Sequence, residues 1–324
     1  MPKVSVIVPI YGVERYIVRC AQSLFSQTLD DIEFIFVDDC SPDNSMALLQ
    51  QEIEKNRPRF AGMNWTVRTV KMPTNSGLAA VRRHGIQLAT GQFVIHCDSD
   101  DWVAPDAYKL MYEKAMEDGL DIVLCDYYRS DGVTHEYYKN GVDGLKSKDE
   151  YFRQLLTYRC STSVWTKLVK RELYTKNDLL YPNDNMWEDF VLSIQLFYYA
   201  KKIGYLPEPL YYYYYNPSSI SYSNIDKRQE QIQHNAKIIL DFLEANKLND
   251  KFKDQIVFFK YMSRSELVLF TKERKYLLQW RSTFPEVNRL FWNNKEFNIK
   301  EKLKFIVIYM GLYKFYIRTK GKQA

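Results

Sequence analysis

One apolar segment that ends in a cluster of carboxylates constrains this chain more than any other feature. Residues 93–97 are largely apolar, and three aspartates follow within the next four positions. If the segment is a buried strand, Asp98 and Asp100 leave its carboxyl end on the same side, where ligands of open α/β sheets bind. The pair therefore predicts a Mg²⁺ or Mn²⁺ site for a diphosphate. The alternative is that Asp101 or Asp106 caps the next helix.

Apolar runs and helix-like segments alternate through the first 125 residues. This alternation predicts an α/β fold with a mostly parallel sheet flanked by helices. Gly91 is predicted to end the third helix in a left-handed conformation. Strands are predicted at residues 4–10, 33–37, 66–71, 93–97 and 121–125, and helices at 14–27, 41–54, 78–89 and 105–117.

The residues at the carboxyl ends of these strands exclude one common class of enzyme. A dinucleotide-binding fold needs G-x-G-x-x-G after the first strand, and residues 9–14 here read Pro-Ile-Tyr-Gly-Val-Glu. Asp38 and Asp39 end the second predicted strand, and an acidic end disfavours direct contact with phosphate. A metal ion or the hydroxyls of a nucleoside would have to lie between these carboxylates and the phosphate.

Cysteine usage and hydropathy indicate where such a chain would work. The five cysteines form no C-x-x-C pair, so we expect free buried thiols in a reducing compartment. His96 is expected to be a satisfied core residue. The apolar run at 4–10 is too short for a signal peptide, and no stretch reaches the roughly 18 apolar residues of a membrane span. We expect a cytoplasmic protein, either free or peripheral on the inner face of the plasma membrane.

A series of short motifs in a particular order covers residues 3 to about 221. Together they resemble glycosyltransferase family 2, in particular its bacterial surface-polysaccharide members. The resemblance implies a GT-A catalytic domain at 1–221 and leaves 222–324 as a helical C-terminal region. The motifs lie at residues 4–11, 36–43, 75–82, 85–91, 98–101, 164–168, 188–189 and 208–212.

The family resemblance also implies a role for individual residues. Asp100 would ligate the metal that bridges both phosphates, and Asp98 would touch the ribose or support the metal. Asp39 would accept a hydrogen bond from the base, commonly uracil. The residues implied to bind the nucleotide-sugar are Pro9, Tyr11, Glu14, Asp39, Arg82, Asp98, Ser99 and Asp100.

On the acceptor side, Asp189 stands where inverting members keep their general base. Trp165, Lys167 and Glu188 would line the acceptor and the diphosphate. An alternative for Glu188 and Asp189 is that they complement the dipole of a helix that starts there. For residues 38–39 the alternative is an Asx turn, which is compatible with base recognition.

These implications lead to a functional hypothesis. We expect an inverting, metal-dependent hexosyltransferase that moves a sugar from a nucleotide-diphospho-sugar, in the first place a UDP-sugar, to a growing, lipid-linked glycan. One alternative is a sugar-phosphate nucleotidyltransferase, although residues 11–15 lack the Gly-rich loop that it requires. The other is a non-catalytic membrane-docking or assembly protein on a degenerate transferase fold.

The basic character of the chain is confined to its end. Residues 295–324 carry eight Lys or Arg against two Glu, a net +6, so the other 294 residues sum to −1 of the total +5. The amphipathic stretch 300–322 suits an anionic membrane surface. Alternatively, it packs on the catalytic domain or on a second subunit of a homodimer. No nucleic-acid-binding module is visible.

Overall fold

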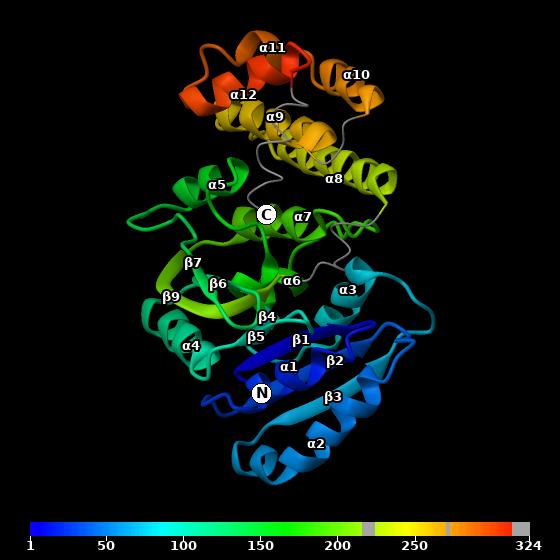
Figure 1. Cartoon of the computed structure of the whole chain (residues 1–324). Helices are drawn as coiled ribbons and strands as arrows, with labels where there is room; N and C mark the ends of the chain where they lie inside the picture. The colour runs from blue at the N-terminus through cyan, green and yellow to red at the C-terminus, as the bar shows by residue number, and fades with distance from the viewer. Residues whose placement is uncertain (216–223, 270–272, 313–324) are drawn as a thin grey trace. The chain divides into compact units, whose positions relative to one another are not determined.

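The computed structural model describes residues 1–215, 224–269 and 273–312, which fall into two units (Figure 1). Of these residues, 1–154 and 159–215 form the first unit, and 155–158 with the C-terminal helices form the second. The predicted domain boundary after residue 221 lies outside the described residues.

The first unit is organised around a sheet that has nine strands in the described residues. The strands are β1 Val4–Ile10, β2 Ile32–Asp38, β3 Thr66–Lys71, β4 Phe93–His96, β5 Trp102–Val103, β6 Ile122–Ser130, β7 His135–Tyr138, β8 Lys167–Lys170 and β9 Ile203–Tyr214. Their order is β3-β2-β1-β4-β8-β6-β9-β5, with β7 beside β6. Strands β1 to β4 run parallel, whereas β8 is antiparallel to both of its neighbours. The predicted α/β fold with a mostly parallel sheet is confirmed.

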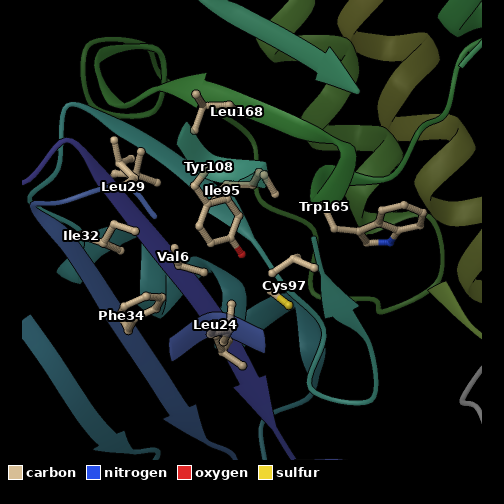
Figure 2. Packing of buried hydrophobic residues seen from close by; sticks show 14 of the residues in the cluster. Val6, Leu24, Leu29, Ile32, Phe34, Ile95, Cys97, Tyr108, Trp165 and Leu168 are labelled. Atoms are coloured by element: carbon tan, nitrogen blue, oxygen red, sulfur yellow. The ribbon is translucent and has the colours of Figure 1, made fainter. Parts of the chain in front are cut away.

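Helices cover both faces of this sheet. Those of the first unit are α1 Ile17–Phe25, α2 Ser45–Gly62, α3 Leu78–Leu88, α4 Ala107–Asp118, α5 Lys148–Leu156, α6 Arg171–Thr175 and α7 Glu188–Tyr199. On one face, Val6, Phe34 and Ile95 from three strands pack with Leu24 of α1 and Tyr108 of α4 (Figure 2). Alternation puts Ile7 on the opposite face, against α3. The layered core holds the strand ends in fixed positions.

Two local predictions differ from the structure. Helix α2 continues past residue 54 and through Pro58, because Phe60 in its last turn is buried against Phe25 at a ring distance of 4.8 Å. The prediction for Gly91 is wrong, since its φ is not positive. Gly91 is instead required for close approach: a Cβ there would lie 2.7 Å from the backbone nitrogen of Ser5.

The second unit is helical in all the elements that the structure describes, as predicted for the chain after about residue 226. Its helices are α8 Ile225–Ala245, α9 Lys253–Leu269, α10 Arg274–Ser282, α11 Val287–Leu290 and α12 Ile299–Tyr309. An aromatic core that contains Tyr261, Trp280, Phe291 and Phe305 joins α9 to α12. Among the described residues, no helix combines the length and the apolar character needed to cross a bilayer.

Candidate active site

The strand order reverses between β1 and β4, and we use the term crevice for the position outside the carboxyl ends of these strands, where open α/β sheets bind ligands. From β1, the chain order proceeds through β2 and β3 on one side, and β4 lies on the other. Such a reversal separates the loops at the carboxyl ends of adjacent strands and leaves room for a ligand. The loops after β1, β2 and β4 hold the predicted nucleotide-binding and metal-binding residues, except Pro9 in β1 and Arg82 in α3.

The two aspartates at the end of β2 have different roles. Asp38 Oδ1 accepts a hydrogen bond from the backbone nitrogen of Ser41 at 2.7 Å, which forms the predicted local turn. Asp39 points instead to the loop before α3, where it accepts from the nitrogens of Ser76 at 2.7 Å and Gly77 at 2.8 Å. Asp39 is therefore a fixed, buried acceptor at the edge of the crevice.

The loop after β1 is fastened to the loop after β2. The backbone nitrogen of Gly12 donates to Ser41 Oγ at 3.0 Å, and Glu14 Oε2 accepts from the nitrogen of Asn44 at 3.1 Å. Pro9 is buried within β1, whereas the Tyr11 side chain is 50% exposed. Tyr11 is thus available to a base, and Glu14 serves to hold the loop.

Residues of β9 form hydrogen bonds with the loop after β4 that carries the carboxylates. The Tyr211 hydroxyl donates to Asp101 Oδ2 at 2.6 Å and accepts from the backbone nitrogen of Asp98 at 3.0 Å. Asp101 Oδ1 accepts from the nitrogen of Tyr214 at 2.7 Å. Burial, reinforced by the charges of Asp100 and Asp98, raises the pKa of Asp101 well above its usual value. Asp101 is therefore part of the support for the loop.

This geometry decides against the helix-cap alternative. Neither Asp101 nor Asp106 makes a side-chain cap to α4, and Asp106 accepts instead from the Thr28 hydroxyl at 2.5 Å. Asp98 and Asp100 remain partly exposed at the crevice, while Ser99 between them is buried.

A second support comes from α1. The guanidinium of Arg19 lies 3.8 Å from the ring centroid of Trp102 and 4.7 Å from that of Tyr214. From this position it donates to the backbone carbonyl of Asp100 at 2.8 Å. The planar group contacts both rings, and these contacts orient it toward the carbonyl of the predicted metal ligand.

Arg82 of α3 links the loop after β4 to the start of α7. Its guanidinium donates to Asp98 Oδ1 at 2.5 Å and is also paired with Glu188, and only 3% of Arg82 is exposed. Burial alone would lower the Arg82 pKa, but the charges of Asp98 and Asp189 outweigh it and raise the pKa. Arg82 thereby contacts Glu188, which lies 106 positions further along the sequence.

Asp189 lies in the first turn of α7, next to this ion pair. Burial raises its pKa; the charges of Arg82 and Lys167 oppose that shift, and Asp98 adds to it. Glu188, the other acidic residue of this turn, is buried against Arg82. Both carboxylates lie in the first turn of α7, as the dipole alternative requires, and Glu188 is in addition paired with Arg82.

The side chains of Trp165 and Lys167 are buried and do not reach the surface. The Lys167 ammonium is fully buried and donates to the carbonyls of Ser161 at 2.7 Å and Ser163 at 2.6 Å. Burial lowers its pKa. Trp165 is buried and stacks on Tyr211 at a ring distance of 4.3 Å. Both side chains support the wall of the site.

Some contacts of the site had no signal in the sequence. Asn185 Oδ1 accepts from the backbone nitrogen of Ala79 at 3.2 Å, at the start of α3. The contacts of Tyr211 and Arg19 likewise join distant segments. His96 is buried as predicted, but neither of its ring nitrogens has a hydrogen-bond partner among the described residues, so it is not satisfied. Burial lowers its pKa far below the usual value.

The residues present fit a divalent cation that is shared with a substrate. Within the described ranges, no group of three or more His, Cys, Asp or Glu residues could enclose a metal. Mg²⁺ and similar ions are, however, commonly held by one or two carboxylates together with substrate phosphates and water. Asp98 and Asp100 supply such a pair.

Comparison with known proteins identifies the family of the chain. The family described as "Glycosyl transferase family 2" matches residues 5–174. The chain belongs to glycosyltransferase family 2. The uncharacterised glycosyltransferase EpsJ of Bacillus subtilis is 32% identical over 247 residues, which cover 74% of this chain and 69% of EpsJ.

Two further relatives extend beyond the catalytic segment. The cholesterol galactosyltransferase of Borreliella burgdorferi is 24% identical over 333 residues, covering 97% of this family 2 chain and 86% of that protein. The crystal structure of residues 1–349 of Staphylococcus aureus TarS with UDP-GlcNAc superimposes with a TM-score of 0.62. It is 20% identical and covers 89% of this chain and 91% of that one, which confirms the GT-A-like fold.

Proposed function

We propose that this chain is an inverting, metal-dependent hexosyltransferase that transfers a sugar from a UDP-sugar to a hydroxyl of a growing, lipid-linked surface glycan. The family and the general activity of nucleotide-sugar transfer rest on the comparisons. The observation that carries the mechanism is Arg82, which joins the predicted donor carboxylate Asp98 to the turn that contains Asp189.

The donor is expected to lie in the crevice with its base at Tyr11 and Asp39. Tyr11 has an exposed ring, and Asp39 is a rigid acceptor that suits an N–H of uracil. TarS binds UDP-GlcNAc on the same fold, which supports a UDP-sugar. Pro9, Glu14 and Ser99 would shape the pocket and its loops.

Charge governs departure of the nucleotide. A divalent cation held by Asp98 and Asp100 would supply Lewis acidity to the diphosphate as it gains negative charge. Arg82 is buried and already paired with Asp98 and Glu188, so its part is to hold the Asp98 carboxylate in place. Arg19 and Tyr211 keep the loop of Asp98 and Asp100 in position.

Asp189 is the proposed general base. Its carboxylate takes the proton of the acceptor hydroxyl while that oxygen bonds to the anomeric carbon from the face opposite the diphosphate. The bond from that carbon to the phosphate oxygen breaks, and its electron pair leaves with UDP. The raised pKa of Asp189 improves its basicity compared with an ordinary aspartate.

The lipid-linked nature of the acceptor has separate support. The relative that spans nearly the whole of this chain is named for transfer of galactose to cholesterol, which is a membrane lipid. Glu188, beside the base, and the wall that Trp165 and Lys167 support would border the acceptor. The first unit, in the predicted domain 1–221, would hold the complete catalytic apparatus.

A direct test uses purified protein, a panel of UDP-sugars and GDP-sugars, Mn²⁺ and a bacterial lipid extract. We expect one UDP-sugar to release UDP in a manner that requires the extract, with a product of inverted anomeric configuration by NMR. The Asp189→Asn variant should lose this transfer. A retained configuration, or full transfer by that variant, would contradict the proposal. Transfer of a nucleotidyl group would favour the nucleotidyltransferase alternative.

A further inference from the structure

Helix α12 has one packed apolar face and a second apolar face that is exposed except for the half-buried Ile306. Phe305 and Ile308 are buried in the aromatic core of the second unit. At 3.6 residues per turn, Ile299, Leu303, Ile306 and Met310 form a different stripe on the opposite side. Ile299 is 75% exposed, Leu303 58% and Met310, the C-cap residue, 64%.

Charge is arranged around this stripe in a specific way. Helical geometry places Lys302 on one flank and Lys300 on the other, with Lys304 beyond it. The only acidic residue of α12, Glu301, lies toward the packed side and accepts from the backbone nitrogen of Asn298 in a capping box. The exposed side of the helix is therefore apolar at its centre and positive at its edges.

Exposed aromatic and aliphatic side chains lie near both ends of α12. Trp292, which is about half exposed, lies near the N-terminal half of α12, since Lys302 Nζ donates to the carbonyl of Trp292 at 3.1 Å. Tyr309 and Leu312 are exposed at the other end. Tryptophan and tyrosine are the residues that favour the boundary between lipid headgroups and acyl chains.

We propose that this exposed side of α12 lies in the interface of an anionic bilayer. The helix is far shorter than a span, and it combines an apolar stripe, two basic flanks and interfacial aromatic residues, which suits a helix parallel to the membrane plane. The four further basic residues of the sequence after residue 312 add to the attraction for anionic lipid.

A second copy of the chain fits this surface less well. In a two-fold dimer the same patch meets itself, so the lysines that flank one stripe would approach those of the other. The stripe also offers four side chains, whereas a stable interface uses about 20–30 residues on each side. An anionic surface neutralises the lysines and needs no such area.

The test is cosedimentation of the full chain with vesicles, without any nucleotide-sugar. Vesicles contain either phosphatidylcholine alone or phosphatidylcholine with phosphatidylglycerol. We expect binding to the anionic vesicles only, and weaker binding as salt rises. Because no sugar transfer is measured, the result does not depend on the proposed function.

Matched variants separate the apolar and the charged contributions. Replacing Ile299 and Leu303 together by Gln should lower the vesicle partition coefficient about tenfold or more. Lys300→Gln should lower it roughly fivefold. Val133→Gln, at a residue 87% exposed in the first unit, and Lys176→Gln, at the C-cap of α6, are the controls and should leave binding unchanged.

Three results would overturn the proposal: equal binding to both kinds of vesicle, no effect of the α12 variants, or self-association in light scattering that those variants abolish while vesicles do not bind. Circular dichroism and thermal unfolding would establish that each variant is folded, since the substituted side chains are exposed.

Discussion

At the scale of single residues, the site depends on side chains that position others. Tyr211 is an example, because its one hydroxyl both donates to Asp101 and accepts from the backbone of Asp98. Without this hydroxyl, Asp101 Oδ2 and the backbone nitrogen of Asp98 would each lose this partner, and Asp101 would keep only the bond from the nitrogen of Tyr214. The orientation of the loop that holds Asp98 and Asp100 therefore depends on a residue more than 100 positions away.

This contact gives a prediction for Tyr211→Phe. We expect the variant to lose about 1–3 kcal/mol of stability in urea unfolding and to bind UDP more weakly in the presence of Mn²⁺. Tyr212→Phe is the matched control, since the described residues show no hydrogen bond to that hydroxyl. If both variants behave alike, the support assigned to Tyr211 is wrong.

Asp189 gives a prediction that separates catalysis from stability. Asp189→Asn should lower kcat by about 10² to 10⁴ through loss of the base. The folded pKa of Asp189 is raised, so its contribution to stability declines as pH rises through that pKa. The neutral Asn should therefore not lower the melting temperature at neutral pH.

Glu188→Gln is the neighbouring control. It weakens the buried pair with Arg82, so we expect a loss of about 1–3 kcal/mol in unfolding free energy. An Asp189→Asn protein that is as unstable as the Glu188→Gln protein would contradict the electrostatic account of Asp189.

The pH dependence of the wild-type reaction follows from the same shift. A general base must be ionised, so kcat should fall as pH decreases through the raised pKa of Asp189. The apparent pKa on the acid side of the kcat profile is expected to lie above the ordinary aspartate pKa of about 3.9. UDP affinity measured over the same range shows whether binding has failed instead. An apparent pKa at or below the ordinary aspartate pKa would argue against Asp189 as the general base.

At the scale of secondary-structure elements, the position of β4 depends on a close approach to β1. Gly91→Ala would place a methyl group 2.7 Å from the nitrogen of Ser5. We expect a loss of about 1–3 kcal/mol in urea unfolding and a lower affinity for UDP, because the carboxylates after β4 move with it. Gly62→Ala in α2 meets no atom within 4 Å and should be neutral or stabilising. Equal stability of the two variants would contradict this account.

The predictability of each element follows from the range of its contacts. The strands that end at Asp38 and His96 were predictable because each is a short apolar run followed at once by polar residues. Strand β5 has only two residues, too few for any periodic signal. Strand β9 contains two prolines, and it pairs with β6 through register shifts that no local pattern encodes.

In the site, too, short local motifs were predictable and contacts between distant segments were not. The carboxylates Asp39, Asp98 and Asp100 stand in motifs of a few residues, so the sequence points to them. Arg82 and Glu188 also stand in motifs, but the sequence does not show that they pair, because they meet only through tertiary packing of α3 and α7. The burial of Lys167 is a similar case: a lysine in a short motif suggests contact with solvent or ligand, and only the fold shows that carbonyls enclose it.

At the scale of the whole molecule, charge and catalysis are assigned to different parts. The predicted catalytic residues all belong to the first unit, and the excess of positive charge belongs to the last 30 residues. A transferase that acts on a lipid-linked glycan needs both a donor site and a means of staying near its acceptor. We infer that the two units divide these tasks.

Calorimetric titration of UDP, with GDP in parallel and with or without Mn²⁺, tests the central claim most directly. The account predicts that UDP binds more tightly than GDP, that Mn²⁺ strengthens this binding, and that Asp100→Ala abolishes the metal-dependent part. Binding of UDP that is indifferent to Mn²⁺ and to Asp100→Ala, or no binding of either nucleotide, would contradict the account.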